Sequence, residues 1–180
     1  MHRAHGISYR RAGPDDQEWL AELDDSFTTD TVLEVAAGPG GFTVREALLD
    51  RPLTKTFPPD EDEWSPGVLV DAAVSGAAGC GFVAFEVTAW NRRLVVHEIA
   101  VAPGHRGRGI GAALMERACR YGRRNGARTA WLETSNVNVP AVRAYQRMGF
   151  ALCGLDSSLY RGTPSEGEVA LFMSRALDAG

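Results

Sequence analysis

Residues 101–115 read VAPGHRGRGIGAALM, and this stretch decides the fold. An apolar, strand-like run ends at Val101, and a run with helical spacing begins at Gly109. Arg106 and Arg108 stand between closely spaced glycines. Backbone amides at such a helix start lack partners within the helix, and together with the helix dipole they form an anion site. The stretch therefore predicts a strand, a turn and a helix that hold a diphosphate.

The neighbouring segments place this turn in a mixed sheet. Strand-like runs at 68–74, 81–90 and 93–101 are separated by short turns, which predicts an antiparallel meander. Residues 109–125 carry one apolar helical face, and Gly126 suits the left-handed position that closes a helix. The next strand, 127–134, follows a short crossover helix and is therefore expected to run parallel to 93–101.

The remaining segments complete an α+β fold. We expect a strand at 7–12, a helix at 14–24, a strand at 42–48 and a surface loop at 58–67, whereas 24–35 shows no clear period. A second helix is expected at 138–148, and a hairpin is expected from 150–160 and 168–177. The prediction is a mainly antiparallel sheet with one parallel step, flanked by helices, in a single domain over 1–180.

Composition limits the classes of function. The chain has 180 residues and a formal net charge of −4, which argues against a sequence-independent nucleic-acid binder. The first residues lack the apolar run of a signal peptide, and no run is long enough to span a bilayer. Three scattered cysteines form no pair typical of a disulfide framework or a zinc site, so we expect no metal and a cytoplasmic location.

The glycine-rich turn can also be compared with other phosphate-binding motifs. A Walker loop needs Lys followed by Ser or Thr after its last glycine, but Ala112 and Ala113 follow Gly111. A dinucleotide fingerprint is formally met by Gly107-x-Gly109-x-x-Ala112 with Glu133 downstream, yet no further strand–helix units follow. A glycine-rich connection with surface arginines is the remaining simple interpretation.

Two motifs together resemble the GNAT superfamily of N-acyltransferases. Arg106-x-x-Gly109-x-Gly111 is similar to its acyl-CoA pyrophosphate turn, and NVNVPAVRAYQRMGF (136–150) resembles its following helix. The resemblance implies a splayed parallel strand pair with pantetheine in the gap, and acetyl-CoA as acyl donor. It implies these cofactor-binding residues: Ile99, Ala100, Val101, Arg106, Gly107, Arg108, Gly109, Ile110, Gly111, Ala112, Asn138, Ala141 and Tyr145.

Acetyl transfer to an amine needs a base, and the departing thiolate gains from an acid. His97 and Glu98 interrupt an apolar strand, and as adjacent residues they are expected to point to opposite faces. Glu98 is favoured over His97 as the base, since burial would make it more basic. Tyr145 is the candidate acid. No cysteine lies in these motifs, so we expect direct attack by the amine.

A narrower resemblance concerns the acceptor. Segments 23–35, 88–94, 131–141 and 148–162 are similar to the streptothricin acetyltransferases, which acetylate the β-lysine arm of the antibiotic and confer resistance. A cationic acceptor needs carboxylates and an aromatic wall. The candidates are Asp24, Asp25, Asp30, Glu34, Trp90, Glu133 and Asp156.

The chain departs from those enzymes at His97 and Ala100, positions that are often acidic there, and this bears on the base and on the acceptor. The alternatives are another small amine, a protein N-terminus, or a non-catalytic acyl-CoA-binding module. We expect a monomer or homodimer that binds neither nucleic acid nor membrane.

Overall fold

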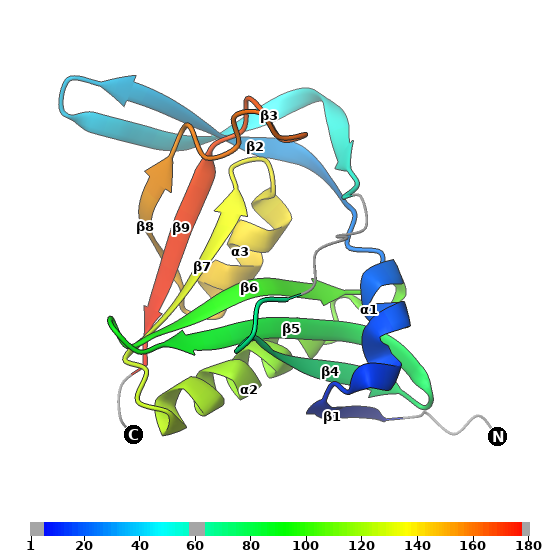
Figure 1. Cartoon of the computed structure of the whole chain (residues 1–180). Coiled ribbons are helices and arrows are strands. Elements are labelled where there is room, and N and C mark those ends of the chain that lie inside the picture. Colours follow the sequence, from blue (N-terminus) through cyan, green and yellow to red (C-terminus); the bar gives the residue numbers. More distant parts are fainter. Residues whose placement is uncertain (1–5, 58–63, 178–180) are drawn as a thin grey trace. The chain divides into compact units, whose positions relative to one another are not determined.

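The computed structural model describes residues 6–57 and 64–177 (Figure 1). Seven strands form one sheet in the order β1-β4-β5-β6-β7-β9-β8, and β2 and β3 form a separate two-stranded sheet. The chain divides into two compact units, which are described separately below. The first takes in residues 6–25, 57, 64–130 and 176–177, and the second takes in 26–56 and 131–175.

The first unit is built on the predicted meander. Its strands are β1 (Ile7–Arg11), β4 (Leu69–Ser75), β5 (Ala78–Thr88) and β6 (Arg93–Val101). Each pairs with the next in an antiparallel ladder. The opening strand and the meander are thus confirmed. Of the predicted loop at 58–67, residues 58–63 lie outside the described residues, and Trp64 to Gly67 are exposed.

Two helices cover opposite faces of these strands (Figure 1). The predicted helix at 14–24 is divided into a 3-10 turn, Pro14–Asp16, and a short helix α1, Gln17–Glu22. The division falls at Asp16, whose carboxylate accepts from the Gly13 amide at 2.8 Å and thereby closes the first turn. Trp19, Leu20 and Leu23 pack against Phe82, Ala84 and Ala100, which anchors α1 on one face.

Helix α2 (Ile110–Arg124) packs on the other face and confirms the helix expected at 109–125. Leu114, Met115 and Ala118 are fully buried. A side chain at Gly122 would come within 3.1 Å of Leu94 Cβ, so glycine allows α2 to lie close to β6. Gly126, with φ +82°, follows the helix as predicted.

The second unit holds most of β7 (Thr129–Ser135), helix α3 (Val139–Arg147), and the strands β8 (Ala151–Asp156) and β9 (Ala170–Ala176). β8 and β9 pair antiparallel, which confirms the predicted hairpin. Alternate residues of β7 are buried: Ala130, Leu132 and Thr134. None of the helices in the described part of the chain has the length and apolar character that crossing a bilayer requires.

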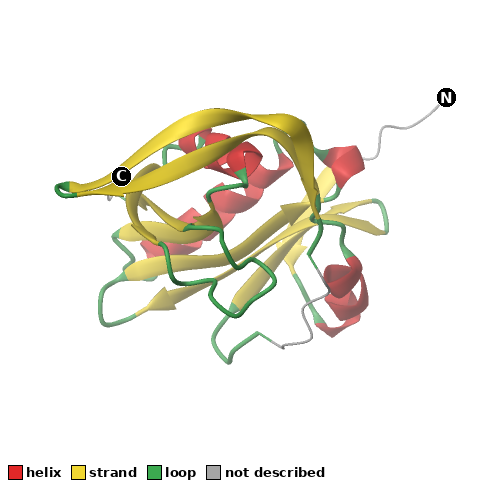
Figure 2. Ribbon diagram, turned by 90° about the horizontal axis from the view of Figure 1, so that it is seen from above, coloured by secondary structure: helices red, strands yellow, loops and turns green. Residues whose placement is uncertain are grey.

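The second unit also carries a long ribbon of β2 (Phe27–Gly38) and β3 (Gly41–Lys55), seen from above in Figure 2. The strand expected at 42–48 is therefore longer, and the segment without a clear period is itself a strand. Its period is hidden because Thr29 and Thr31 occupy buried positions that an apolar residue usually fills. The Thr29 hydroxyl donates to the Thr31 carbonyl at 2.7 Å, next to an irregularity in the ladder.

Candidate active site

The turn before α2 presents open backbone. Gly107 and Gly109 have φ of +73° and +78°, in the left-handed region that favours glycine. An added Cβ at either glycine would meet nothing within 4 Å, so this backbone faces open space. The first turn of α2 carries no acidic residue. Its unpartnered amides and the helix dipole therefore form a site suited to an anion.

The two arginines of the turn differ in their surroundings. Arg106 Nε donates to the Val101 carbonyl at 2.8 Å, and a terminal nitrogen donates to the Asp24 carbonyl at 3.3 Å. The Arg106 side chain thus ties the turn to the end of β6 and to the segment after α1. Arg108 is exposed to solvent.

Strand β6 contains a bulge at His97. Glu98 pairs with Ala84 and Val96 pairs with Phe85, so β6 has one residue more than β5 at this point. Glu86 and Ala84, two apart on β5, share a face. Glu98 pairs with Ala84, so its side chain lies on that face. The His97 side chain lies on the same face, because its ring contacts Glu86. The predicted opposite orientation of His97 and Glu98 is wrong, because the extra residue breaks the alternation.

The imidazole of His97 has a carboxylate partner. His97 Nε2 lies 2.9 Å from Glu86 Oε1, and about one third of each side chain is exposed. The Trp64 ring lies beside the imidazole, with 6.3 Å between ring centroids and 51° between planes. Glu98 is half-buried on the same face, and Ala100 is buried in the α1 core. Ile99, between them, is half-buried and pairs with Val83 on the opposite face. Glu86 was not among the predicted site residues.

The second unit holds the residues predicted on the helix after β7. Asn138 caps α3, and its side-chain oxygen accepts from the Ala141 amide at 3.2 Å. Tyr145 is half-buried, with its ring centroid 6.2 Å from that of Phe150. Gly149 follows the helix with φ +86°. Helix α3 thus lies within the predicted range 138–148.

The predicted acceptor residues of the first unit are Asp24, Asp25 and Trp90. Asp24 is exposed and Asp25 is half-buried. Burial raises the pKa of Asp25 above its ordinary value, its own backbone amide opposes this, and Asp24 adds to the rise. Trp90 is 88% exposed in the turn between β5 and β6, at the opposite end of β6 from Val101.

The predicted acceptor residues of the second unit have several kinds of partner. Asp30 accepts from the Thr31 hydroxyl at 2.9 Å, and Glu34 pairs with Arg45 across the ribbon at 3.0 Å. Asp156 accepts from the Ser158 hydroxyl and amide, both at 2.7 Å, and the hydroxyl bond is the main cause that lowers its pKa.

Glu133 on β7 accepts a hydrogen bond from Tyr160, which comes from the connection between β8 and β9. Burial and then this bond raise the pKa of Tyr160 well above its ordinary value. Sequence reasoning missed Tyr160, because 27 residues separate the two partners and no local pattern links them.

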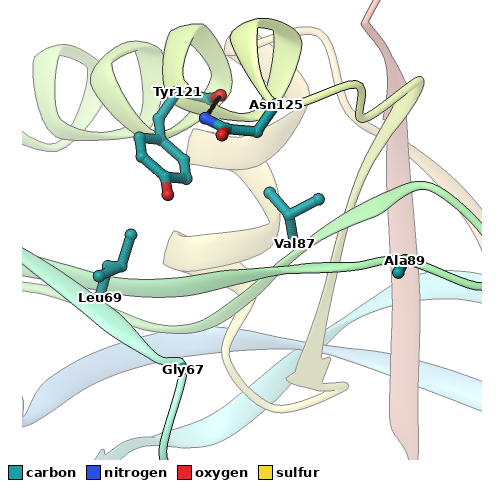
Figure 3. A pocket seen from close by; sticks show the side chains of 6 residues that line it. All are labelled: Gly67, Leu69, Val87, Ala89, Tyr121 and Asn125. Carbon is teal, nitrogen blue, oxygen red and sulfur yellow. Dashed lines mark hydrogen bonds between the residues drawn. The ribbon is translucent and has the colours of Figure 1, made fainter.

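A cleft of about 320 Å³ lies elsewhere in the first unit, between α2 and the strands β4 and β5 (Figure 3). The Tyr121 side chain reaches from α2 toward the strands, and its backbone carbonyl accepts from the Asn125 side chain. The six lining residues are Gly67, Leu69, Val87, Ala89, Tyr121 and Asn125. They include none of the predicted site residues.

The chain is similar to known acetyltransferases in sequence and in structure. The model of the Acetyltransferase (GNAT) family matches residues 33–150. The chain is 49% identical to Streptothricin acetyltransferase of Streptomyces lavendulae, over 97% of this chain and 98% of that protein. It also resembles the crystal structure of nourseothricin acetyltransferase, with 50% identity and a TM-score of 0.90, over 96% of this chain and 99% of that one.

A protein of Bacillus anthracis str. Ames, solved in complex with acetyl coenzyme A, shares the fold. Its TM-score is 0.80 at 24% identity, over 98% of this chain and 100% of that one. The mixed sheet with one parallel pair, β6 and β7, is the fold of the family. These matches exclude the dinucleotide and non-catalytic interpretations of the glycine-rich turn. The chain therefore belongs to the GNAT family, whose members are acetyltransferases that take their acetyl group from acetyl-CoA.

Proposed function

We propose that this chain acetylates a primary amine of a streptothricin-class antibiotic, in the β-lysine arm, and so confers resistance. One observation carries the proposal: the likeness to the Streptomyces lavendulae enzyme extends over nearly the whole of both chains. A likeness confined to the cofactor half would leave the acceptor undefined, because only the remaining half distinguishes one acceptor from another.

The donor is proposed to bind through backbone. The amides of residues 107–112 would hold the diphosphate, and the open space around Gly107 and Gly109 supports this role. Arg108 adds positive charge at the rim. Residues 99–101 would hold the pantetheine arm and the thioester carbonyl, and Asn138, Ala141 and Tyr145 would complete the cofactor site.

The reaction is proposed as direct attack. Glu98 or His97 takes a proton from the ammonium group of the acceptor, and the neutral nitrogen then bonds to the thioester carbon as the carbon–sulfur bond breaks. The second proton of that nitrogen leaves to solvent. The thiolate takes a proton from Tyr145, whose phenol, with an ordinary pKa of about 10, is protonated at neutral pH. Solvent then restores both groups. The common face of His97 and Glu98 supports this proposal, because it makes both available to one substrate.

The acceptor would be held by carboxylates. Asp25 and Glu133 are the best supported, since both are half-buried and a partly desolvated carboxylate attracts an ammonium group more strongly. Asp24, Asp30, Glu34, Trp90 and Asp156 are retained as further candidates. The partners of Glu34 and Asp156 compete with a ligand for the same oxygens.

The test is release of free thiol from acetyl-CoA by the purified protein. Streptothricin should support release, and the product should carry one acetyl group on the β-lysine arm. Streptothricin with its β-lysine amines chemically blocked is the matched control and should be inert. A peptide with a free N-terminus and a simple polyamine represent the alternative acceptors. No streptothricin-dependent release would remove the proposal, and release with the peptide or the polyamine alone would select the alternative.

The assigned roles are tested by Glu98→Gln, His97→Ala and Tyr145→Phe. At least one of the two base variants, and Tyr145→Phe, should lower turnover by tenfold or more, about 1.4 kcal/mol of barrier. Turnover that stays within tenfold in all three would show that the assignments are wrong while leaving acetyl transfer intact. The single domain, the cytoplasmic location and the state as monomer or homodimer stay predictions of the sequence.

A further inference from the structure

The carboxylate of Glu86 faces a possible catalytic base from the neighbouring strand. Glu86 pairs with Val95 in the ladder, and His97, two residues after Val95, occupies the diagonal position beside Glu86. The bulge adds Glu98 to the same face. The two side chains meet at 2.9 Å between His97 Nε2 and Glu86 Oε1. This contact joins β5 and β6 on the face that also carries Glu98.

The contact fixes which ring nitrogen carries the proton. An ionised carboxylate only accepts hydrogen bonds, so Nε2 must be the donor. In the neutral imidazole Nδ1 then keeps its lone pair, and that nitrogen is the one able to accept a proton. A carboxylate that orients an imidazole in one tautomer is a recurrent arrangement for a general base.

The surroundings fit a base that a substrate can reach. About one third of each of the two side chains is exposed, so the pair is neither sealed in the core nor fully solvated. The Trp64 ring lies on one side of the imidazole, with 6.3 Å between the ring centroids.

We propose that Glu86 is a positioning residue for His97, whose Nδ1 takes the proton of the acceptor amine. This inference rests on the proposed acetyl transfer and selects His97 rather than Glu98 as the base. Nδ1 takes a proton from the ammonium group, and the neutral nitrogen then bonds to the thioester carbon as the carbon–sulfur bond breaks. The second proton of the nitrogen leaves to solvent, and Tyr145 protonates the thiolate. Glu86 stabilises the resulting imidazolium until it returns the proton to solvent. Glu98, on the same face, is left to attract the cationic acceptor.

The first measurement needs no acceptor. Long-range proton–nitrogen NMR correlations of the histidine rings, assigned with His97→Ala, report the tautomer of His97 directly. The wild-type protein should show the Nε2–H tautomer. Glu86→Gln should lose this preference, because an amide can both donate and accept, and Glu86→Asp should keep it at least in part. An Nδ1–H tautomer in the wild type, or no change in Glu86→Gln, would overturn the proposal.

The second measurement is turnover with streptothricin. His97→Ala should lower kcat about 100-fold and Glu86→Gln about tenfold, with KM for acetyl-CoA changed by less than about twofold. Glu86→Asp should recover most of the loss. In the His97→Ala background Glu86→Gln should cost nothing more, since Glu86 acts through the imidazole. A further tenfold loss in that background would contradict the positioning role.

A matched control separates charge from position. Glu116→Gln removes an equal charge from a pair with Arg123 on α2 and should leave kcat unchanged. Thermal unfolding of each variant checks that it is folded. If streptothricin is not acetylated, the proposed function fails, but the tautomer measurement still decides whether Glu86 holds His97.

Discussion

Gly109→Ala tests whether the turn before α2 binds the diphosphate through its backbone. Gly109 has φ +78°, and an added Cβ would meet nothing within 4 Å. The substitution therefore causes no clash, and its cost to folding is the left-handed conformation alone, roughly 1–2 kcal/mol. For a chain of this size that lowers the melting temperature by about 2 to 8 °C.

The loss of CoA affinity should exceed the loss of stability. If the amides of the turn hold the diphosphate, as proposed, the new methyl group would stand where the phosphate oxygens approach, and the loss of one charge-assisted hydrogen bond would cost roughly 1.5–3 kcal/mol. We expect the dissociation constant of CoA, measured by calorimetry, to rise about tenfold to 100-fold. Pantetheine, which lacks the diphosphate, should bind both proteins equally.

Gly104→Ala is the matched control. Gly104 lies in the same connection, outside the left-handed region, and an added Cβ there also meets nothing within 4 Å. It should change neither the melting temperature nor CoA affinity. Unchanged CoA binding in Gly109→Ala, or an equal loss in Gly104→Ala, would refute backbone recognition of the diphosphate.

Three further predictions concern stability. The Asp16 carboxylate is buried and accepts from Arg10 at 2.6 and 2.7 Å, and this bond holds its pKa well below the ordinary range. Because the pKa of Asp16 is lower in the folded than in the unfolded protein, the ionised carboxylate stabilises the fold fully above about pH 4, and this stabilisation is lost as pH falls further. Asp16→Asn should therefore lower the free energy of unfolding by about 2 kcal/mol at pH 7, measured by urea unfolding, and by much less at pH 2. Gly79→Ala would bring a Cβ within 2.3 Å of the Trp19 ring, and a loss of about 1–3 kcal/mol is expected by the same assay. Asn138→Ala removes the α3 cap and should lower the free energy of unfolding by about 1 kcal/mol. Asn138→Asp keeps a capping side chain, so it should retain this stability, but it should weaken the binding of CoA.

Features encoded by local sequence were predicted correctly. Gly126 follows α2 in the left-handed conformation, and α3 lies within the range expected for the second helix, because helix ends depend on one or two residues. The meander was predicted for a similar reason, since short turns leave adjacent strands few alternatives to pairing with each other.

Features that depend on a distant partner were not predicted. Strand β2 carries Thr29 and Thr31 at buried positions, and its pairing with β3 supplies a periodicity that the side chains do not. Tyr160 reaches Glu133 from the connection between β8 and β9, 27 residues further along the chain. The bulge at His97 is fixed by the register of β6 against β5, and the sequence of β6 alone carries no sign of it.

The contact between Glu86 and His97 bears on the residues at which this chain departs from the streptothricin acetyltransferases. The resemblance implies that the positions of His97 and Ala100 are often acidic in those enzymes, which predicts a weaker hold on a cationic acceptor in this chain. In this chain Glu86 provides a carboxylate 2.9 Å from the imidazole, on the same face. Glu98 of β6 lies on this face as well. With the imidazole neutral, Glu86 and Glu98 give this face two carboxylates. When His97 is protonated, these three groups together carry a net charge of about −1. If His97 is the base, as proposed, this face combines negative charge for a cationic acceptor with a group that can take the acceptor's proton.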